Sequence, residues 1–232
     1  MRQRWARLLF LHWAVEPAAV QRTLPGGLTV DCLDGRAWIG LVPFFMRDVR
    51  PAGFPVVPGI SNFLELNVRT YVHDARGRPG VWFYSLDCNQ WLAVEAARRF
   101  FHLPYEHASI AATVTEETGE VDFRVRRWGT KARCRFRYPS VQHGHLAAPG
   151  TPEFFLLERY TLFAHDRRGD RLLAGRVAHA PYRFETTAAP VWDDAMVRRA
   201  GFDSGGRSPD HTCVADAVAV DIFPLEAVDR RS

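Results

Sequence analysis

The sequence predicts a β-rich α+β fold in a single domain spanning residues 1–232. Apolar runs of strand length recur from residue 5 to residue 222, separated by turns rich in glycine, proline and aspartate. The clearest helical period is confined to one short segment, residues 90–101. A chain of 232 residues, 47% of them hydrophobic, is long enough to bury one large core and short enough to form one domain.

The first third of the chain predicts strands and one short helix. Residues 5–13 form an apolar run, and Pro17 in a first turn predicts a helix that ends before the turn at 24–27. Residues 28–33 and 37–46 flank Asp34-Gly35, a pair that predicts a hairpin. Residues 50–59 contain three prolines, so we expect an irregular loop close to the mouth of a site.

The middle of the chain predicts a second strand pair followed by a helix. Residues 62–73 and 80–86 flank a turn at 74–79. Asp87 or Asn89 is expected to cap the helix at 90–101, and its apolar residues Leu92, Ala96 and Phe100 to dock on the sheet. Further strands are expected at 109–115, 121–128, 132–138, 159–165, 171–179 and 213–222, with one helical turn at 153–158 and a poorly periodic insertion at 185–210.

One predicted strand carries an unusual set of polar side chains. Between Phe63 and Tyr71, every second residue is polar (Glu65, Asn67 and Arg69), whereas the residues between them are mostly apolar. Side chains alternate faces along a strand, so one face presents a carboxylate, an amide and a guanidinium in a row. Flanking aromatic residues favour the wall of a pocket, although a solvated sheet face gives the same alternation.

Two neighbouring segments add candidates for that pocket. Phe83 and Ser85 bring aromatic and small polar groups together on the strand that is expected to pair with residues 62–73. His102 and Tyr105 follow the predicted helix and have side chains suited to acid–base chemistry. The alternative for these two residues is a helix end in which histidine favours the dipole and tyrosine fills a packing gap.

Charge and cysteine content narrow the classes of protein. The net charge is +4, with 30 basic and 26 acidic residues, and Lys131 is the sole lysine. Six arginines between Arg124 and Arg137 form a basic hairpin that could hold nucleic acid, but a solvated sheet face is the favoured interpretation. His143 and His145 lack a partner at metal-ligand spacing, so no metal is expected. Four scattered cysteines and no export or membrane segment predict a cytoplasmic protein.

Several segments resemble the uncharacterised bacterial YqjF-like family. They are LFLHW (9–13), DGRAWIGLVPF (34–44), FLELNVRTYV (63–72), GVWFYSLD (80–87) and FFHLPY (100–105), and ERY (158–160) and HAP (179–181) continue the match. The resemblance therefore covers nearly the whole chain. That family is assigned to the acetoacetate decarboxylase-like superfamily, which implies an antiparallel sheet curved into a cone-like barrel around a ligand cavity, with a few short helices.

The resemblance does not extend to the lysine chemistry of acetoacetate decarboxylases. In those enzymes a proline precedes paired lysines, one of which forms a Schiff base while the other lowers its pKa. The equivalent stretch here is Pro104-Tyr105-Glu106, and Lys131 lies in the basic hairpin. Schiff-base decarboxylation is therefore not expected. The resemblance gives Glu65 the position of a glutamate that superfamily enzymes place on the sheet.

The leading hypothesis is a pocket for a small carbonyl or carboxylate compound, without a cofactor. Arg69 would pair with an anionic group, Glu65 would move a proton, and Tyr105 would donate a hydrogen bond. The further binding candidates are Asn67, Tyr71, Phe83, Ser85 and His102. Any reaction would be proton transfer beside a carbonyl, as in lyases, hydratases and isomerases. The alternatives are a non-catalytic sensor or carrier, or a nucleic-acid or anionic-surface binder through the 124–137 hairpin. The sequence leaves open whether the protein forms a homo-oligomer.

Overall fold

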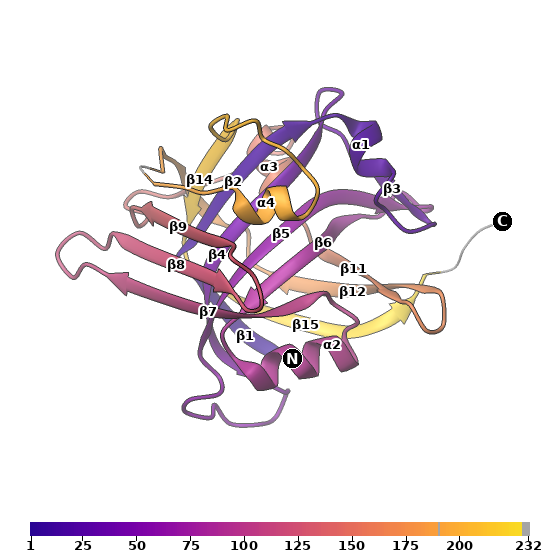
Figure 1. The fold of residues 1–232 in the computed structure, drawn as a ribbon. Helices are drawn as coiled ribbons and strands as arrows, with labels where there is room; N and C mark the ends of the chain where they lie inside the picture. The colour runs from indigo at the N-terminus through magenta and orange to yellow at the C-terminus, as the bar shows by residue number, and fades with distance from the viewer. Residues whose placement is uncertain (190, 229–232) are drawn as a thin grey trace.

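The computed structural model describes residues 1–189 and 191–228. Strands dominate this part of the chain, with four short helices among them (Figure 1). The β-rich fold class expected from the sequence is thereby confirmed. No helix in the described residues is long and apolar enough to cross a membrane.

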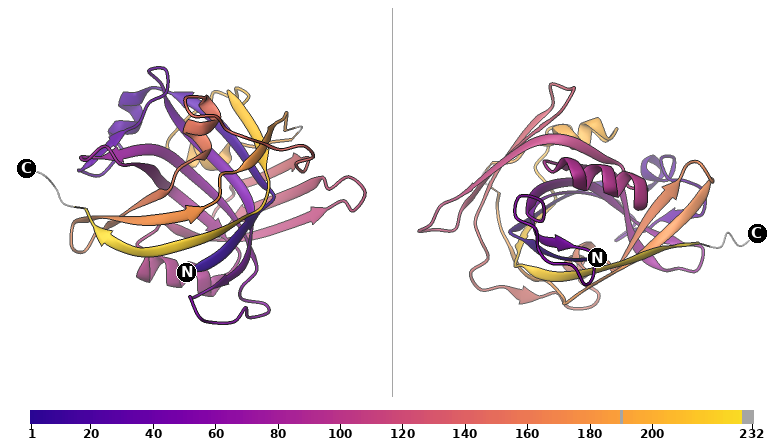
Figure 2. Two further views of the ribbon diagram at one scale, coloured as in Figure 1. Left: turned by 180° about the vertical axis from the view of Figure 1, so that it is seen from behind. Right: turned by 90° about the horizontal axis from the view of Figure 1, so that it is seen from below.

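Seven strands close into a ring. Each strand pairs with the next in the order β4, β5, β6, β11, β12, β15 and β1, and β1 pairs with β4 to close the ring. Figure 2 (right) shows this closed outline, with α2 (Trp91–Phe100) along one side. The bounds are β1 (Arg2–Ala6), β4 (Ala37–Arg50), β5 (Phe63–Asp74), β6 (Pro79–Cys88), β11 (Thr161–Asp166), β12 (Arg171–His179) and β15 (Val218–Ala227).

The ring confirms the expected closed sheet, but it is not a regular barrel. β6 runs parallel to β11 on one side and parallel to β7 (Tyr105–Val114) further along its length. Both parallel pairings are short, because each extends over only two or three residues of β6. The other strand pairs of the ring are antiparallel, as expected.

Two arms extend from the ring. β4 is 14 residues long, so its second half pairs with β1 while its first half pairs with β2 (Leu8–Val15). From β2 the sheet continues through β14 (His211–Ala215), β13 (Arg183–Thr186) and β10 (His145–Leu146). The other arm starts at β6 and contains β7, β8 (Val121–Arg127) and β9 (Arg133–Tyr138), which Figure 1 shows crossing the ring.

This arrangement creates two large hydrophobic cores and a smaller cluster that includes Val72 and Phe163. One lies inside the ring and contains residues such as Phe44 and Leu86. The other lies between the ring and the arms, where Leu66 and Val68 of β5 pack with Phe123 of β8. Both faces of β5 are consequently covered by protein.

Three of the four helices in the described residues begin and end close to the expected positions, whereas α4 (Ala195–Arg199) lies in the insertion at 185–210, where no helix was expected. The other three are α1 (Pro17–Gln21), α2 and α3 (Pro152–Leu157). The side chain of Gln90 accepts the hydrogen bond at the start of α2, whereas Asn89 accepts from the backbone N–H of Leu64, so the expected caps were wrong. The expected apolar stripe was wrong as well, because Leu92 and Phe100 are exposed.

Two strand predictions near the N-terminus also differ from the structure. Asp34 and Gly35 do form a tight turn with positive φ, bracketed by a bridge between Leu33 and Arg36. However, β3 (Leu28–Val30) pairs with β5 and not with β4, so there is no hairpin of the expected length. The single strand expected at 5–13 is divided into β1 and β2 at Arg7, which has a φ of 51°.

Candidate functional site

The ring encloses a cavity of about 330 Å³. Its wall is mostly apolar and comes from the ring strands and from α2. The polar side chains that reach it include Glu65, Asn67, Arg69, Tyr105 and Arg159, and three of these are on one strand, β5. A largely apolar cavity with a few convergent polar groups is typical of a small-molecule site.

The polar face of β5 is enclosed by protein. Glu65, Asn67 and Arg69 expose only 2%, 5% and 8% of their surface, and all three line the cavity. The intervening residues Leu66 and Val68 point the other way, into the core beneath the arms. The alternating pattern therefore separates a cavity face from a core face, and the solvated-face alternative does not hold.

Glu65 is a buried carboxyl group beside a phenol. The hydroxyl of Tyr105 donates to Glu65 Oε2 over 2.8 Å. Burial raises the pKa of Glu65 to about 8, and the charge of Asp87 adds to this, while hydrogen bonds from Tyr105 and Asn67 oppose it. The pKa of Tyr105 is raised well above 10, first by burial and then by Glu65, so Tyr105 stays a neutral donor.

Arg69 is a buried cation without a carboxylate partner. Its Nη2 donates to the carbonyl oxygen of Leu156 over 3.1 Å and to the hydroxyl of Tyr71 over 3.4 Å, and its guanidinium lies 5.3 Å from the centre of the Phe10 ring. Its buried Nε has no hydrogen-bond partner in the described residues. No ion pair between Arg69 and a carboxylate is found in that part of the chain either. A buried charge is costly unless it is paired, so an anion at this position would be strongly favoured.

Two further cavity residues qualify this arrangement. Arg159 also lines the cavity, but its Nη1 is 2.6 Å from Asp31 Oδ2, so its charge is already paired. Asn67 Oδ1 is buried without a hydrogen-bond partner among the described residues. Among the described residues, the wall therefore offers a buried cation without a carboxylate partner, at Arg69, and two free acceptors, at Asn67 Oδ1 and Gln3 Oε1. Arg50 also lines the cavity, where it donates to the carbonyl oxygen of Asp48.

The structure brings together some of the predicted site residues and separates others. Phe83 lines the same cavity as the β5 residues and Tyr105. Tyr71 is fully buried and does not line the cavity. Its hydroxyl accepts a hydrogen bond from Arg69 Nη2. His102 lies outside, with Nδ1 at 3.8 Å from Asp166 Oδ1.

Ser85 is displaced by an irregularity in the pairing of β5 and β6. Arg69 pairs with Phe83, but Val68 pairs with Ser85, so Tyr84 is an extra residue on β6. Beyond this bulge the faces of β6 are exchanged. Ser85 consequently accepts a hydrogen bond from buried Arg127 outside the ring, and it does not line the cavity.

Sequence reasoning missed a group of buried polar residues behind Arg69. His12 Nε2 is 2.8 Å from the Tyr71 hydroxyl, and His12 Nδ1 is 3.0 Å from His211 Nδ1. Burial lowers the pKa of His12, and the neighbouring His211 and Arg69 lower it further. A histidine inside the apolar run at 8–15 was the available signal, because a polar residue on a buried strand needs a partner.

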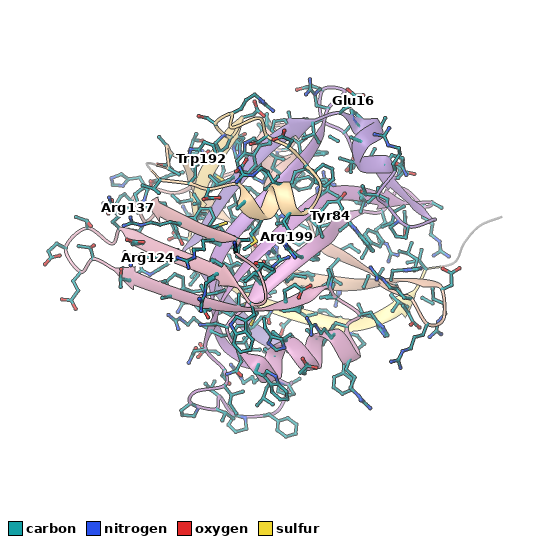
Figure 3. All side chains as sticks on the ribbon, in the orientation of Figure 1. Glu16, Tyr84, Arg124, Arg137, Trp192 and Arg199 are labelled. Carbon is teal, nitrogen blue, oxygen red and sulfur yellow. The ribbon has the colours of Figure 1, made fainter. Side chains whose placement is uncertain are left out.

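Four of the six arginines of the basic hairpin form ion pairs with acidic residues, and Arg126 and Arg133 form none among the described residues. Arg124 and Arg135 both pair with Asp122, on the outer face where Figure 3 shows Arg124. Arg137 pairs with Glu120, 2.7 Å away. This pairing weakens the nucleic-acid alternative, since phosphate binding requires free cations.

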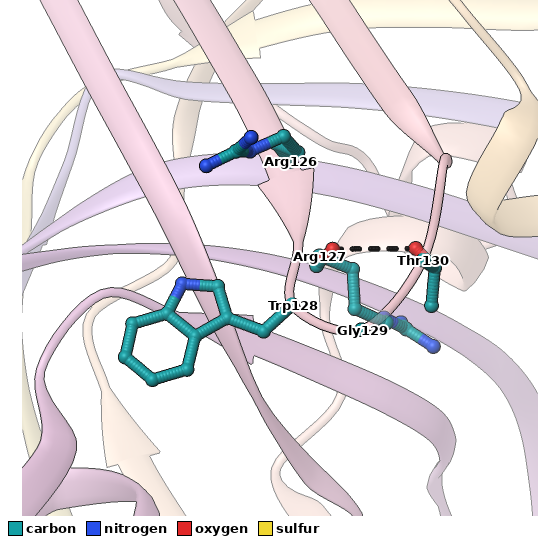
Figure 4. A pocket seen from close by; sticks show the side chains of 5 residues that line it. All are labelled: Arg126, Arg127, Trp128, Gly129 and Thr130. Carbon is teal, nitrogen blue, oxygen red and sulfur yellow. Dashed lines mark hydrogen bonds between the residues drawn. The ribbon is translucent and has the colours of Figure 1, made fainter.

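The turn of the hairpin forms a small surface pocket. Figure 4 shows its five lining residues, 126–130, with the Thr130 hydroxyl donating to the carbonyl oxygen of Arg127. The guanidinium of Arg127 is engaged elsewhere, since it pairs with buried Asp87. Lys131 follows this turn, is exposed, and does not line the ring cavity. The described residues contain no cluster of three or more metal-ligating side chains.

The enclosed polar strand and the closed ring define a protein of the acetoacetate decarboxylase-like fold. A structure titled as an acetoacetate decarboxylase-like enzyme from Sphingomonas wittichii RW1 superposes with a TM-score of 0.66 at 13% identity, covering 98% of this chain and 92% of that chain. The enduracididine biosynthesis enzyme MppR complexed with pyruvate superposes with a TM-score of 0.65 at 15% identity, covering 97% and 89%. At such identities the likeness shows the fold alone.

Sequence comparison identifies the family. Residues 2–219 match the DUF2071 family of uncharacterized conserved proteins, and the chain belongs to that family. The uncharacterized protein YqjF of Bacillus subtilis (strain 168) is 35% identical over 193 residues, covering 82% of this chain and 77% of YqjF. The resemblance noted in the sequence is therefore confirmed.

Proposed function

We propose that the ring cavity binds a small carboxylate compound through Arg69 and that Glu65 transfers a proton at a carbon beside a carbonyl group of that compound. The observation that carries the binding step is the buried guanidinium of Arg69, which lines the cavity without a carboxylate partner in the described residues. A ligand carboxylate supplies the missing counter-charge and can accept from the free Nε.

Glu65 has the properties that the proton transfer needs. A carboxyl group whose pKa is near 8 is a strong enough base, when ionised, to remove a proton from carbon at neutral pH. The electron pair of the broken C–H bond moves onto the carbonyl oxygen, which becomes an enolate. Tyr105 stays protonated, and its hydroxyl donates to Glu65 in the structure. Once Glu65 has taken the proton from carbon, the single donor of Tyr105 can turn to the enolate oxygen. Return of the proton to another carbon gives an isomerase step. When the enolate instead re-forms the carbonyl group and expels a leaving group, such as hydroxide, from the adjacent carbon, the step is that of a hydratase or lyase.

This chemistry uses no Schiff base. A lysine Schiff base would need a lysine in the cavity, and the sole lysine, Lys131, lies outside it. MppR, whose structure is titled as a complex with pyruvate, shares the fold and is named with a ligand of the same chemical class. That likeness supports a carboxylate ligand for this chain. The proposed localisation is the cytoplasm.

The binding step is tested with a panel of monocarboxylates and oxo acids by isothermal titration calorimetry. The wild-type protein is expected to bind members of the panel, and Arg69→Gln to weaken them at least tenfold, because a hydrogen bond between ionised groups is lost. Equal affinities for the two proteins would refute the role of Arg69.

The proton-transfer step is tested by NMR in deuterated water with the oxo acids that bind. Wild-type protein is expected to exchange the protons beside the carbonyl for deuterium, and Glu65→Gln to lose the exchange while keeping the binding. Binding without exchange in the wild type would identify the non-catalytic carrier or sensor instead.

A further inference from the structure

The cavity opens at one end of the ring and is closed at the other. Among the residues that line it, Ile60 and Leu92 are 43% and 49% exposed, so they mark the opening, between the loop that precedes β5 and the start of α2. Arg69, Leu157 and Tyr182 also line it, but all three are buried. The unpaired guanidinium therefore lies at the blind end.

Glu65 lies between the opening and Arg69. It pairs across the sheet with Cys88, three residues before α2 begins, whereas Arg69 bonds the backbone of α3 at Leu156. Four residues of strand separate their Cα atoms by about 13 Å. The guanidinium of Arg69 donates to the hydroxyl of Tyr71. Because Tyr71 lies two residues further along β5 from Glu65, the side chain of Arg69 points away from Glu65.

The wall between these groups is mostly apolar, and Asn67, which lies between them on β5, is its polar exception. It is lined by Val42, Phe44, Leu86, Leu162, Val177 and Ile222, and α2 contributes three small residues at the opening, Ala93, Ala96 and Ala97. A ligand that reaches from Arg69 to the opening must therefore place hydrocarbon against most of this wall.

The size of the cavity sets the length of that hydrocarbon. A volume of about 330 Å³ holds roughly eleven non-hydrogen atoms at about 30 Å³ each, the share of a molecule in liquid water. An extended carbon chain advances roughly 1.3 Å per bond, from C–C bonds of about 1.5 Å, so an acid of about nine carbons spans on the order of 10 Å. Together with a hydrogen bond of about 3 Å to Arg69, this length covers the separation of about 13 Å between Arg69 and Glu65, so the end of the chain lies beside Glu65, on the side of the opening.

We propose that the ligand of the cavity is a medium-chain carboxylic acid of about eight to ten carbons, with its carboxylate at Arg69 and its chain running past Glu65 to the opening beside α2. The proposal rests on the carboxylate-binding role of Arg69 proposed above and adds the class of acid. Acids of three or four carbons are too short to contact Arg69 and Glu65 together. A reactive carbonyl group therefore lies several bonds from the carboxylate.

The test is the dependence of affinity on chain length, measured by calorimetry with saturated acids from acetate to dodecanoate. Each added methylene is expected to tighten binding about three- to fourfold, up to about decanoate, because it buries apolar surface. Beyond that length the chain reaches solvent and the gain should stop.

A variant that fills the opening sharpens the test. Ala97→Leu should weaken decanoate at least tenfold while leaving hexanoate unchanged, which also shows that the variant is folded. Arg99→Leu, on the exposed side of the same helix, should leave the whole profile unchanged.

The outcomes separate this inference from the proposed function. A flat length profile, or an effect of Ala97→Leu that is equal for hexanoate and decanoate, overturns the medium-chain assignment but leaves carboxylate binding at Arg69 standing. The absence of binding by every acid, or full binding by Arg69→Gln, overturns both.

Discussion

Replacing Glu65 by glutamine is expected to remove a large part of the pH dependence of stability. Glu65 is 2% exposed, and burial raises its pKa from 4.5 to about 8. Between these two pH values the folded protein binds a proton at Glu65 that the unfolded chain has released. Stability therefore falls as pH rises through this range, and the contribution is fully favourable only below pH 4.5.

The magnitude follows from the shift. Each pKa unit corresponds to about 1.4 kcal/mol. Between pH 4.5 and about 8, the unfolding free energy of the wild-type protein should therefore fall by about 5 kcal/mol relative to that of Glu65→Gln. Glutamine is close in shape and has no proton to release in this range. It also keeps an acceptor for the Tyr105 hydroxyl.

The assay is urea denaturation of both proteins at intervals from pH 5 to pH 8.5. The difference in unfolding free energy cancels the contributions of other groups, such as Asp87. Glu117→Gln, which changes an exposed carboxylate in the turn between β7 and β8, is the control and should follow the wild type. Parallel curves for wild type and Glu65→Gln would refute the buried, protonated state of Glu65.

Three further substitutions test the electrostatics and packing of the ring. Arg69→Leu removes a buried charge that has no partner carboxylate, so it should abolish carboxylate binding and change the unfolding free energy by less than about 1 kcal/mol. A loss of unfolding free energy above about 3 kcal/mol would contradict this. Arg127→Met should lower the unfolding free energy, measured by urea denaturation, by about 3–5 kcal/mol, because it leaves the buried carboxylate of Asp87 without its partner. Arg124→Met, at an exposed ion pair, should lower it by less than about 1 kcal/mol. Equal losses would be inconsistent with this account. Gly80→Ala should lower the unfolding free energy by about 1–3 kcal/mol, because an added Cβ would lie 2.5 Å from the carbonyl oxygen of Thr161, where β6 meets β11. An unchanged midpoint of thermal or chemical denaturation would argue against that close approach.

Local patterns predicted the strand that carries the site but not its surroundings. The alternation at residues 63–72 separates polar from apolar side chains, and the structure keeps that separation. It could not reveal that both faces are covered, because the second cover comes from β7–β9, which begin more than thirty residues later. The contact between Glu65 and Tyr105 likewise depends on the distant pairing of β7 with β6.

The errors have local physical causes. The extra residue Tyr84 in β6 exchanges the two faces, so simple alternation misplaced Ser85. On α2, Phe100 is exposed and Leu92 lies at the exposed edge of the cavity, whereas Ala93, Ala96 and Ala97 line the cavity together with Phe101. The buried residue of the helix is Val94, which lies outside the fourfold repeat of Leu92, Ala96 and Phe100.

The most direct test of the account is a crystal structure of the protein with nonanoate. The account predicts that the carboxylate lies about 2.7–3.2 Å from the guanidinium of Arg69, with the chain passing Glu65 and ending between Ile60 and α2. A carboxylate bound outside the ring, or a chain that enters tail first with its charged end at the opening, would contradict it.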